Sequence, residues 1–215
     1  MTDLSALYEA ILNGDNTTAA KVTQAALAEG ANPADLVTKY MIPAMDEVGR
    51  LFECEEYFVP ELLLAGRAMK AALEFIRPLL AAAGAQPAGR VVIGTVKGDL
   101  HDIGKNLVAA MLEGGGFEVI DLGTDVAPDK FVAAVSEGNV NIVCLSALLT
   151  VTMPAMRTTV DALNKAGVRD RVKIMIGGAP VTAQYAREIG ADSYSENAST
   201  AVATARRLVG GASHV

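Results

Sequence analysis

Histidine and cysteine are scarce in this sequence, and tryptophan is absent. Its two cysteines, Cys54 and Cys144, are too few and too far apart for a disulfide framework or a zinc cluster, so we expect reduced thiols. The two histidines, His101 and His214, cannot by themselves supply a metal site with several protein ligands. A metal that arrives within a cofactor and needs a single protein ligand is still compatible with this composition.

Basic residues and long apolar runs are also in short supply. The chain has 18 Lys and Arg against 25 Asp and Glu, a net charge of −7, which argues against nucleic-acid binding. No run of about 18 uncharged apolar residues occurs, so we expect no membrane span. The first ten residues include Asp3 and Glu9 and no basic cluster, which is unlike a signal peptide. We therefore expect a cytoplasmic protein.

Apolar residues, by contrast, make up 51% of the 215 positions, which is ample for a packed core. At roughly 150 residues per domain, this length suits one large domain or two small ones. The residue pattern changes near position 85, from helical periodicity to an alternation of strands and helices. We therefore predict two domains, 1–86 and 87–215, joined by a linker at 84–89 that is rich in small residues.

The first predicted domain is a four-helix bundle with short connections. Its helices are predicted over 3–12, 17–29, 33–52 and 60–83. Pro43 lies inside the third of these, where it should kink the helix.

The second predicted domain repeats a strand followed by a helix five times. The strands are predicted over 91–96, 117–121, 141–146, 172–176 and 192–194, and the helices over 105–113, 128–137, 154–166, 182–189 and 198–209. This alternation indicates a doubly wound parallel sheet, for which the flavodoxin-like order 2-1-3-4-5 is the simplest expectation.

Ligands of such sheets bind beyond the carboxyl ends of the strands, where glycines, hydroxyls and carboxylates gather in this sequence. The most informative loop follows the first strand and contains Asp99 and His101, flanked by Gly98 and Gly104. A carboxylate that accepts one imidazole N–H leaves the other nitrogen free to bind a metal. By itself, this pattern only suggests such a role, because a loop histidine is more often a surface or hydrogen-bonding residue.

Other common motifs are missing or weak. The chain has no P-loop, no Gly-x-Gly-x-x-Gly after the first strand and no Gly-x-Ser-x-Gly elbow. A hydrolase triad built on Ser146 or Thr152 would have to share His101. Cys144 falls within an apolar strand and is expected to be an inert buried thiol.

Three elements together resemble the signature of cobalamin-binding domains. They are Asp99-x-His101-x-x-Gly104, then Ser146-x-Leu148 after a gap of 41 residues, then Gly177-Gly178. The segments 48–52 and 58–62 are in turn similar to the helical cap of cobalamin-dependent methionine synthase. The likeness covers nearly the whole chain, and its extent resembles that of the small corrinoid proteins of methyltransferase systems.

This resemblance implies cobalamin as the cofactor and assigns roles to particular residues. His101 would replace the cofactor's own base as the lower cobalt ligand, Asp99 would hydrogen bond to it, and Thr152 would supply the hydroxyl of the relay, where methionine synthase has serine. Residues expected to line the slot for the displaced nucleotide tail are Ser146, Thr150, Gly177, Gly178 and Ala198. Phe52 and Val59 would cover the upper face of the corrin. The remaining expected cofactor contacts are Gly98, Leu100, Asp102, Ile103, Gly104 and Leu148.

The resemblance also implies a role and partners. A corrinoid protein carries a methyl group from a substrate:corrinoid methyltransferase to a methylcorrinoid:acceptor methyltransferase, for example one that acts on a tetrahydrofolate or a thiol. The donor would come from methylamine or O-demethylation metabolism, and a reductive activation protein would restore oxidised cobalt. The helical cap would have to move aside for methyl transfer, with 84–89 as the hinge. The alternatives are a cobalamin-binding subunit of a mutase and a cobalamin-dependent sensor or regulator.

Overall fold

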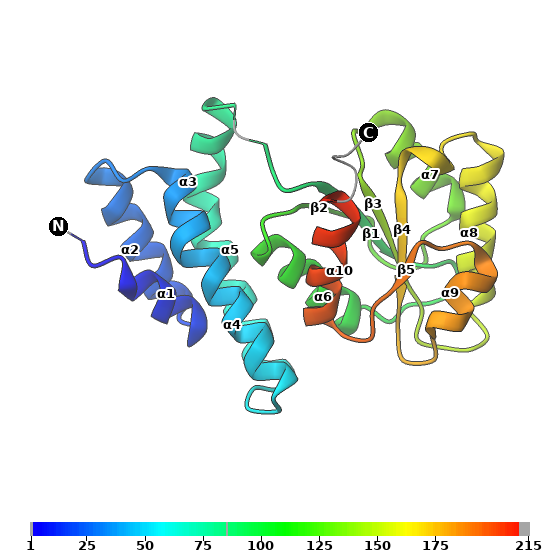
Figure 1. Cartoon of the computed structure of the whole chain (residues 1–215), viewed down its shortest axis with the longest axis horizontal. Helices are drawn as coiled ribbons and strands as arrows, with labels where there is room; N and C mark the ends of the chain where they lie inside the picture. The colour runs from blue at the N-terminus through cyan, green and yellow to red at the C-terminus, as the bar shows by residue number, and fades with distance from the viewer. Residues whose placement is uncertain (1, 85, 211–215) are drawn as a thin grey trace. The chain divides into compact units, whose positions relative to one another are not determined.

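The computed structural model describes residues 2–84 and 86–210, so His214 lies outside the described residues. Contacts divide the chain into two compact units, one formed mainly by residues up to Pro87 and the other mainly by residues from Ala88 onward. Figure 1 shows helices alone in the first unit and a sheet covered by helices in the second. Among the described residues, no helix is both long enough and apolar enough to span a bilayer.

The N-terminal unit is a helical bundle. Its elements are α1 (Ser5–Leu12), α2 (Asn16–Ala28), α3 (Pro33–Leu36), a π-helix (Val37–Met41), α4 (Ile42–Glu53) and α5 (Val59–Ala82). The side chain of Asp15 caps α2 by accepting the N–H of Thr18, and Asn32 caps α3 in the same way through Ala34. The fully buried side chains of its core include Leu7, Ile11, Met41, Leu62, Met69 and Ile76.

The third predicted helix differs from the observed one in its hydrogen bonds. The stretch 33–53 is continuously helical, but Val37–Met41 forms a π-helix, in which the N–H of Ile42 bonds to the carbonyl of Val37, five residues back. Pro43 follows at once; it has no N–H, and in a regular α-helix its ring would crowd the carbonyl four residues earlier. We attribute the wider turn to this proline. The predicted helix is therefore present, but the disturbance before Pro43 takes the form of a π-helix, which the sequence analysis did not predict.

The C-terminal unit contains a five-stranded parallel sheet in the order β2-β1-β3-β4-β5, which confirms the predicted fold class. Its strands are β1 (Arg90–Thr95), β2 (Glu118–Asp121), β3 (Ile142–Ser146), β4 (Lys173–Gly177) and β5 (Ser193–Tyr194). Its helices are α6 (Ile103–Gly114), α7 (Pro128–Glu137), α8 (Pro154–Lys165), α9 (Ala183–Ile189) and α10 (Ala198–Gly210), with a short 3-10 helix at Arg169–Arg171. The short helix was not predicted, and α6 begins two residues before the predicted start at Lys105.

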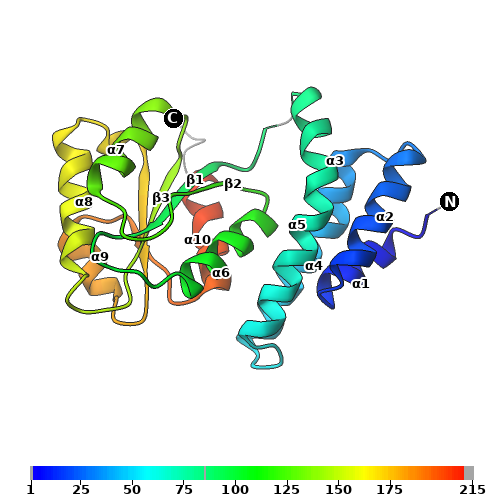
Figure 2. The ribbon, with the colours of Figure 1, turned by 180° about the vertical axis from the view of Figure 1, so that it is seen from behind.

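Helices cover both faces of this sheet. Figures 1 and 2, which view the molecule from opposite sides, place α7, α8 and α9 on one face and α6 and α10 on the other. Alternate residues of each strand serve the two faces, as the two-residue repeat of a strand requires. In β3, Val143 and Leu145 join the core beneath α7, α8 and α9. All five strands run parallel, so the loops after them gather at one edge.

Candidate functional site

The loop between β1 and α6 presents His101 next to a buried carboxylate. Nδ1 of the imidazole lies 2.7 Å from Oδ1 of Asp99, and the same oxygen accepts the backbone N–H of His101 at 3.0 Å. The side chain of His101 is 49% exposed, whereas that of Asp99 is fully buried. No hydrogen bond to Nε2 of His101 is found among the described residues. An ionised Asp99 accepts the Nδ1 proton, and in the neutral imidazole this tautomer leaves the lone pair of Nε2 available to a ligand.

The second oxygen of Asp99 is held by the loop after β3. Its Oδ2 accepts the backbone N–H of Leu148 at 2.8 Å and the hydroxyl of Thr152 at 2.7 Å. The Thr152 hydroxyl also lies 2.8 Å from the carbonyl of Leu149, so its single proton faces two acceptors. The structure thus brings together Asp99, His101 and Thr152, which the sequence analysis had grouped. Loops after two neighbouring strands supply the three residues.

Asp99 is ionised despite its burial. Burial acts to raise the pKa of this carboxyl, but hydrogen bonds from the Thr152 hydroxyl, the N–H groups of His101 and Leu148, and the His101 ring together hold the pKa well below its usual range. The carboxylate is therefore a permanent acceptor at neutral pH. A permanent acceptor keeps the imidazole in one tautomer and one orientation.

The backbone around His101 is also supported, by residues that sequence reasoning missed. The buried hydroxyl of Thr95, at the end of β1, donates to the carbonyl of His101 at 2.8 Å. Asp125, in the loop after β2, accepts the N–H of Gly98 at 2.8 Å and pairs with Lys97 at 3.0 Å. The hydrogen bond from the Gly98 N–H, which has the larger effect, and the contact with Lys97 both lower the pKa of the Asp125 carboxyl. The only sequence feature that could have pointed to Asp125 is its place in the Gly-Thr-Asp segment after β2.

A second unpredicted feature is a buried lysine at the start of α6. Lys105 is almost fully buried, and its ammonium group is paired with Asp121 at the end of β2 and with the side chain of Asn106. The other carboxylate oxygen of Asp121 accepts the N–H of Gly123 at 2.8 Å. The pair therefore ties the helix that follows His101 to the neighbouring strand.

Apolar side chains lie exposed around the histidine loop. Of the six large hydrophobic residues that are exposed in the described part of the C-terminal unit, five belong to the loops after β1 and β3 or to the first turn of α6; they are Leu100, Ile103, Leu148, Leu149 and Val151. Leu100 is 73% exposed and Val151 is 80% exposed. Such a concentration of apolar surface beside one polar ring nitrogen is typical of a ligand site rather than of ordinary protein surface.

The loop after β4 approaches the loop after β3 so closely that only glycine fits. Gly178 has φ +131°, and a Cβ added to it would lie 1.9 Å from the carbonyl oxygen of Ala147. Gly177 ends β4 beside Ser146, its partner in the β3–β4 register. A Cβ at Gly177 would lie 3.1 Å from the carbonyl oxygen of Ser195, just after β5. The backbone at the ends of β3, β4 and β5 is therefore closely packed, with almost no room for side chains at Gly177 and Gly178.

The remaining predicted site residues are distributed as follows. Asp102 is exposed immediately before α6, while Gly104 lies within that helix rather than in the preceding loop, which corrects the predicted loop boundary. Thr150 is exposed in the turn after β3, and Ala198 is buried as the first residue of α10. Among the described residues, no group of three or more His, Cys, Asp or Glu side chains is arranged to hold a metal ion.

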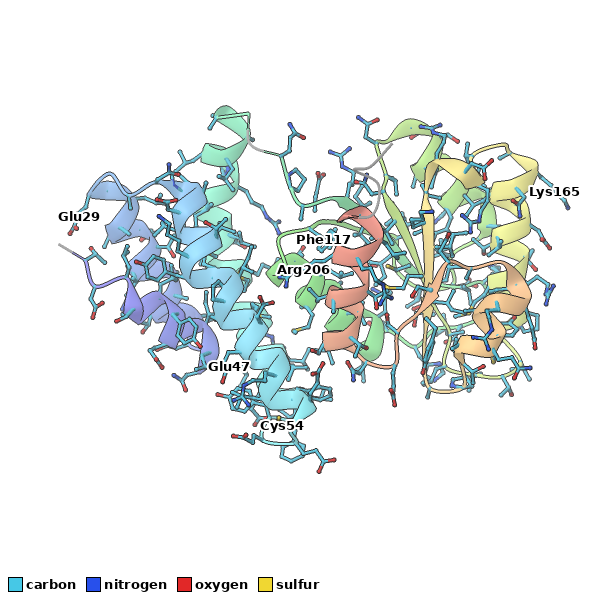
Figure 3. The ribbon with its side chains drawn as sticks, in the orientation of Figure 1. Glu29, Glu47, Cys54, Phe117, Lys165 and Arg206 are labelled. Atoms are coloured by element: carbon cyan, nitrogen blue, oxygen red, sulfur yellow. The ribbon has the colours of Figure 1, made fainter. Side chains whose placement is uncertain are left out.

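Phe52 and Val59 belong to the N-terminal unit. Phe52 lies near the end of α4, and Val59 is the first residue of α5. The turn between them contains Cys54, which is labelled in Figure 3. In this turn, the N–H groups of Glu56 and Tyr57 both bond to the carbonyl of Leu51. The two predicted cap residues therefore flank one turn at one end of the bundle.

Taken together, the parallel sheet order, the carboxylate-held imidazole and the exposed apolar rim mark the edge of the sheet beyond β1 and β3 as the candidate ligand site. Two family models, both described as B12 binding domain, match residues 89–203 and 4–77. The chain belongs to the family of B12-binding corrinoid proteins. Its cofactor is a cobalamin or a related corrinoid.

Known relatives and solved structures agree with this assignment. The chain is 45% identical to dimethylamine corrinoid protein 1 of Methanosarcina acetivorans, over 83% of this chain and 84% of the relative. It is 47% identical to trimethylamine corrinoid protein 2 of Methanosarcina mazei, over 88% of each. A crystal structure of a cobalamin-binding protein from Desulfitobacterium hafniense has a TM-score of 0.78 and 37% identity, over 97% of this chain and 99% of that one. The methanol:cobalamin methyltransferase complex MtaBC from Methanosarcina barkeri has a TM-score of 0.86 and 30% identity, over 97% of this chain and 80% of that one.

Proposed function

We propose that this protein carries a methyl group on a corrinoid whose cobalt is bound by Nε2 of His101. The observation that carries the proposal is the half-exposed His101 imidazole, whose Nδ1 is held by the buried Asp99 carboxylate and whose Nε2 has no hydrogen bond among the described residues. A carboxylate on the far nitrogen of a metal-binding histidine fixes its tautomer and raises its basicity. His101 is then the single protein ligand that a metal already enclosed by a macrocycle requires.

The chain's residues fit a corrin in two further respects. The ring of a corrin is broad and largely apolar, and exposed Leu100, Ile103, Leu148 and Val151 offer a matching surface around His101. The cofactor's nucleotide tail needs a narrow path, which suits Gly177 and Gly178 with their lack of side chains. We assign Ser146, Thr150 and Ala198 to the same path. Phe52 and Val59 are assigned to the upper face.

When bound, the corrinoid supplies a cobalt atom that accepts and releases a methyl group. His101 would hold that cobalt through its Nε2, more weakly when no methyl group is bound. Asp99 and Thr152 would hold the imidazole in position and accommodate a change in its hydrogen bonding. The Thr152 hydroxyl suits this task because it lies between two acceptors, Asp99 and the carbonyl of Leu149. Apolar residues around the site exclude water.

The relatives favour methyl carriage over the roles of a mutase subunit or a regulator. Two of them are named for dimethylamine and trimethylamine, and a structural relative is titled as a methanol:cobalamin methyltransferase complex. We infer a substrate:corrinoid methyltransferase as the methyl-donating partner and a methylcorrinoid:acceptor methyltransferase as the receiving one. We further infer a reductive activation protein, because cobalt that has been oxidised must be reduced before it can accept another methyl group.

The ligand assignment is tested by electron paramagnetic resonance of the cobalt(II) form. The protein is produced with ¹⁵N-histidine and loaded with unlabelled cobalamin. Coordination by a protein histidine then gives doublet splitting from ¹⁵N, whereas the cofactor's own base would give triplets from ¹⁴N. His101→Ala should abolish the doublets, and His214→Ala, the matched control, should keep them. Triplets in the unmodified protein would contradict the assignment.

The methyl-carrier role is tested separately with a panel of purified donor methyltransferases. The reduced, cobalamin-loaded protein is mixed with each enzyme and its methyl donor, methylamines and methanol included. One donor system should convert the visible spectrum to that of the methylated form, and an acceptor methyltransferase should reverse the change. A loaded protein that no donor methylates would not be a methyl carrier of these systems.

A further inference from the structure

The loop that presents His101 is held from both sides, by two different strands. On the β3 side, the Asp99 carboxylate is bonded to Leu148 and Thr152. On the β2 side, a single residue, Asp125, makes three contacts with the same loop. Its Oδ1 accepts the N–H of Gly98 at 2.8 Å, its Oδ2 pairs with Lys97 at 3.0 Å, and its own N–H donates to the carbonyl of Asp99 at 2.9 Å.

The backbone of Asp125 is in an unusual conformation. Its φ is +52°, and among the described residues only one other non-glycine residue, Glu55, has a positive φ. Aspartate tolerates this left-handed region better than most residues, but the conformation still costs energy that the surroundings must offset. Here it allows the N–H and the carboxylate of one residue to bond to the same neighbouring loop. The adjacent bridge between Val96 and Val126 extends the β1–β2 pairing to this point.

Strand pairing alone does not require this arrangement. At the other end of the same two strands, Arg90 and Glu118 form an ion pair at 2.9 Å. That pair joins β1 to β2 far from His101, at the amino ends of the strands. The Asp125 contacts, by contrast, act on residues two to four positions before the histidine. Removing the Arg90–Glu118 pair therefore tests support of the sheet alone, whereas removing the Asp125 contacts tests support of the loop that presents His101.

We propose that Asp125 is a positioning residue for His101: by clamping residues 97–99 from the β2 side, it holds the loop in the conformation that presents the imidazole to cobalt. This inference rests on the proposed function, in which His101 binds cobalt. Among the described residues, Asp125 makes no hydrogen bond to the imidazole of His101; its partners in this loop are Lys97, Gly98 and Asp99. Its loss should leave the apolar rim intact, so the corrinoid stays bound while its bond to His101 weakens.

The test compares three variants of the full chain, loaded with cobalamin and reduced to cobalt(II). Asp125→Gly retains the backbone conformation and removes the carboxylate; Asp125→Asn retains an acceptor for Gly98; Glu118→Gln removes the control ion pair. The ratio of cobalt with ¹⁵N-histidine coupling to cobalt without it should fall about five-fold in Asp125→Gly. A fall of this size corresponds to the loss of the hydrogen bond from the Gly98 N–H, since the exposed ion pair with Lys97 contributes little. The ratio should fall less in Asp125→Asn, and in Glu118→Gln it should equal that of the unmodified protein.

Several results would overturn the inference. A ratio in Asp125→Gly equal to that of the unmodified protein would do so, as would an equal fall in Glu118→Gln. If the unmodified protein shows no histidine coupling, the proposed function fails instead. Amide hydrogen exchange of the cobalamin-free chain then still tests whether Asp125 holds residues 97–99 in place. Asp125→Gly should speed exchange at Gly98 and His101, whereas Glu118→Gln should not, and unchanged exchange would refute the clamp.

Discussion

The carbonyl oxygen of Ala147 lies where a side chain on Gly178 would begin, 1.9 Å from an ideal Cβ. The two residues belong to the loops after β3 and β4, so their contact sets the width of the sheet edge at that point. Because the clash is with backbone, a rotamer change cannot relieve it. One of the two loops would have to move, and with it residues assigned to the nucleotide tail.

Gly178→Ala should therefore destabilise the protein and weaken cobalamin binding together. The clash and the unfavourable φ of +131° combine, and we expect a loss of about 3 kcal/mol or more in the free energy of unfolding. Gly167→Ala is the matched control, since Gly167 has φ +69° with open space around it and should cost only about 1 to 2 kcal/mol. Urea unfolding of the cobalamin-free proteins measures the loss in the free energy of unfolding for each of the two variants. Equal losses would show that the close approach does not matter.

At Gly104, by contrast, we expect one substitution to raise the stability of the protein and to lower its affinity for cobalamin. It lies in α6, and no atom would lie within 4 Å of an added Cβ, so Gly104→Ala should stabilise the cobalamin-free protein by about 0.5–1 kcal/mol. The same methyl group would project beside the proposed corrin, and we expect a fall in cobalamin affinity of about ten-fold, equivalent to about 1.4 kcal/mol. Gly210→Ala, at the far end of α10, is the control that should not change affinity. Unchanged affinity in Gly104→Ala would place the cofactor elsewhere.

The sheet and the centre of the site were predictable because their signals are local. Runs of β-branched residues such as 91–93 alternate with helical segments, and this alternation restricts the topology to a few parallel arrangements. Asp99 and His101 are close in sequence, so their pairing needs no knowledge of tertiary structure. Thr152, 51 residues after His101, was found only through resemblance to a family, because the sequence itself does not reveal that the two loops meet.

The contacts that sequence reasoning missed depend on neighbouring loops. Thr95 resembles any β-branched strand residue, and its hydroxyl gains a role only because the chain turns back toward it at His101. Asp125 acts through a left-handed backbone, which has no periodic signature. Lys105 was predicted only as the first residue of a helix, and nothing in the sequence shows that it is buried against Asp121 on the adjacent strand. The π-helix likewise depends on how the chain accommodates Pro43.

The two cysteines should differ sharply in reactivity. Cys54 is exposed in the turn after α4, whereas Cys144 is buried in β3, and burial raises the pKa of its thiol to about 12. Only the thiolate reacts readily with a disulfide reagent. The native protein should therefore release one equivalent of chromophore from such a reagent at neutral pH, and a second should appear only after unfolding. Cys54→Ser should remove the fast reaction, and rapid labelling of Cys144 in that folded variant would contradict its burial.

The Thr152 hydroxyl should be required for the stability of the site even without cofactor. Thr152→Val preserves shape but removes the donor to Oδ2 of Asp99, leaving a buried carboxylate with one fewer hydrogen bond. We expect a loss of about 1–3 kcal/mol in the free energy of unfolding of the cobalamin-free protein, because the acceptor left behind is charged and shielded from water. Thr152→Ser keeps the hydroxyl and should retain most of that energy. If Thr152→Val is as stable as the unmodified protein while Thr152→Ser loses stability, packing of the methyl group beside Gly98, rather than the hydrogen bond, is what Thr152 contributes.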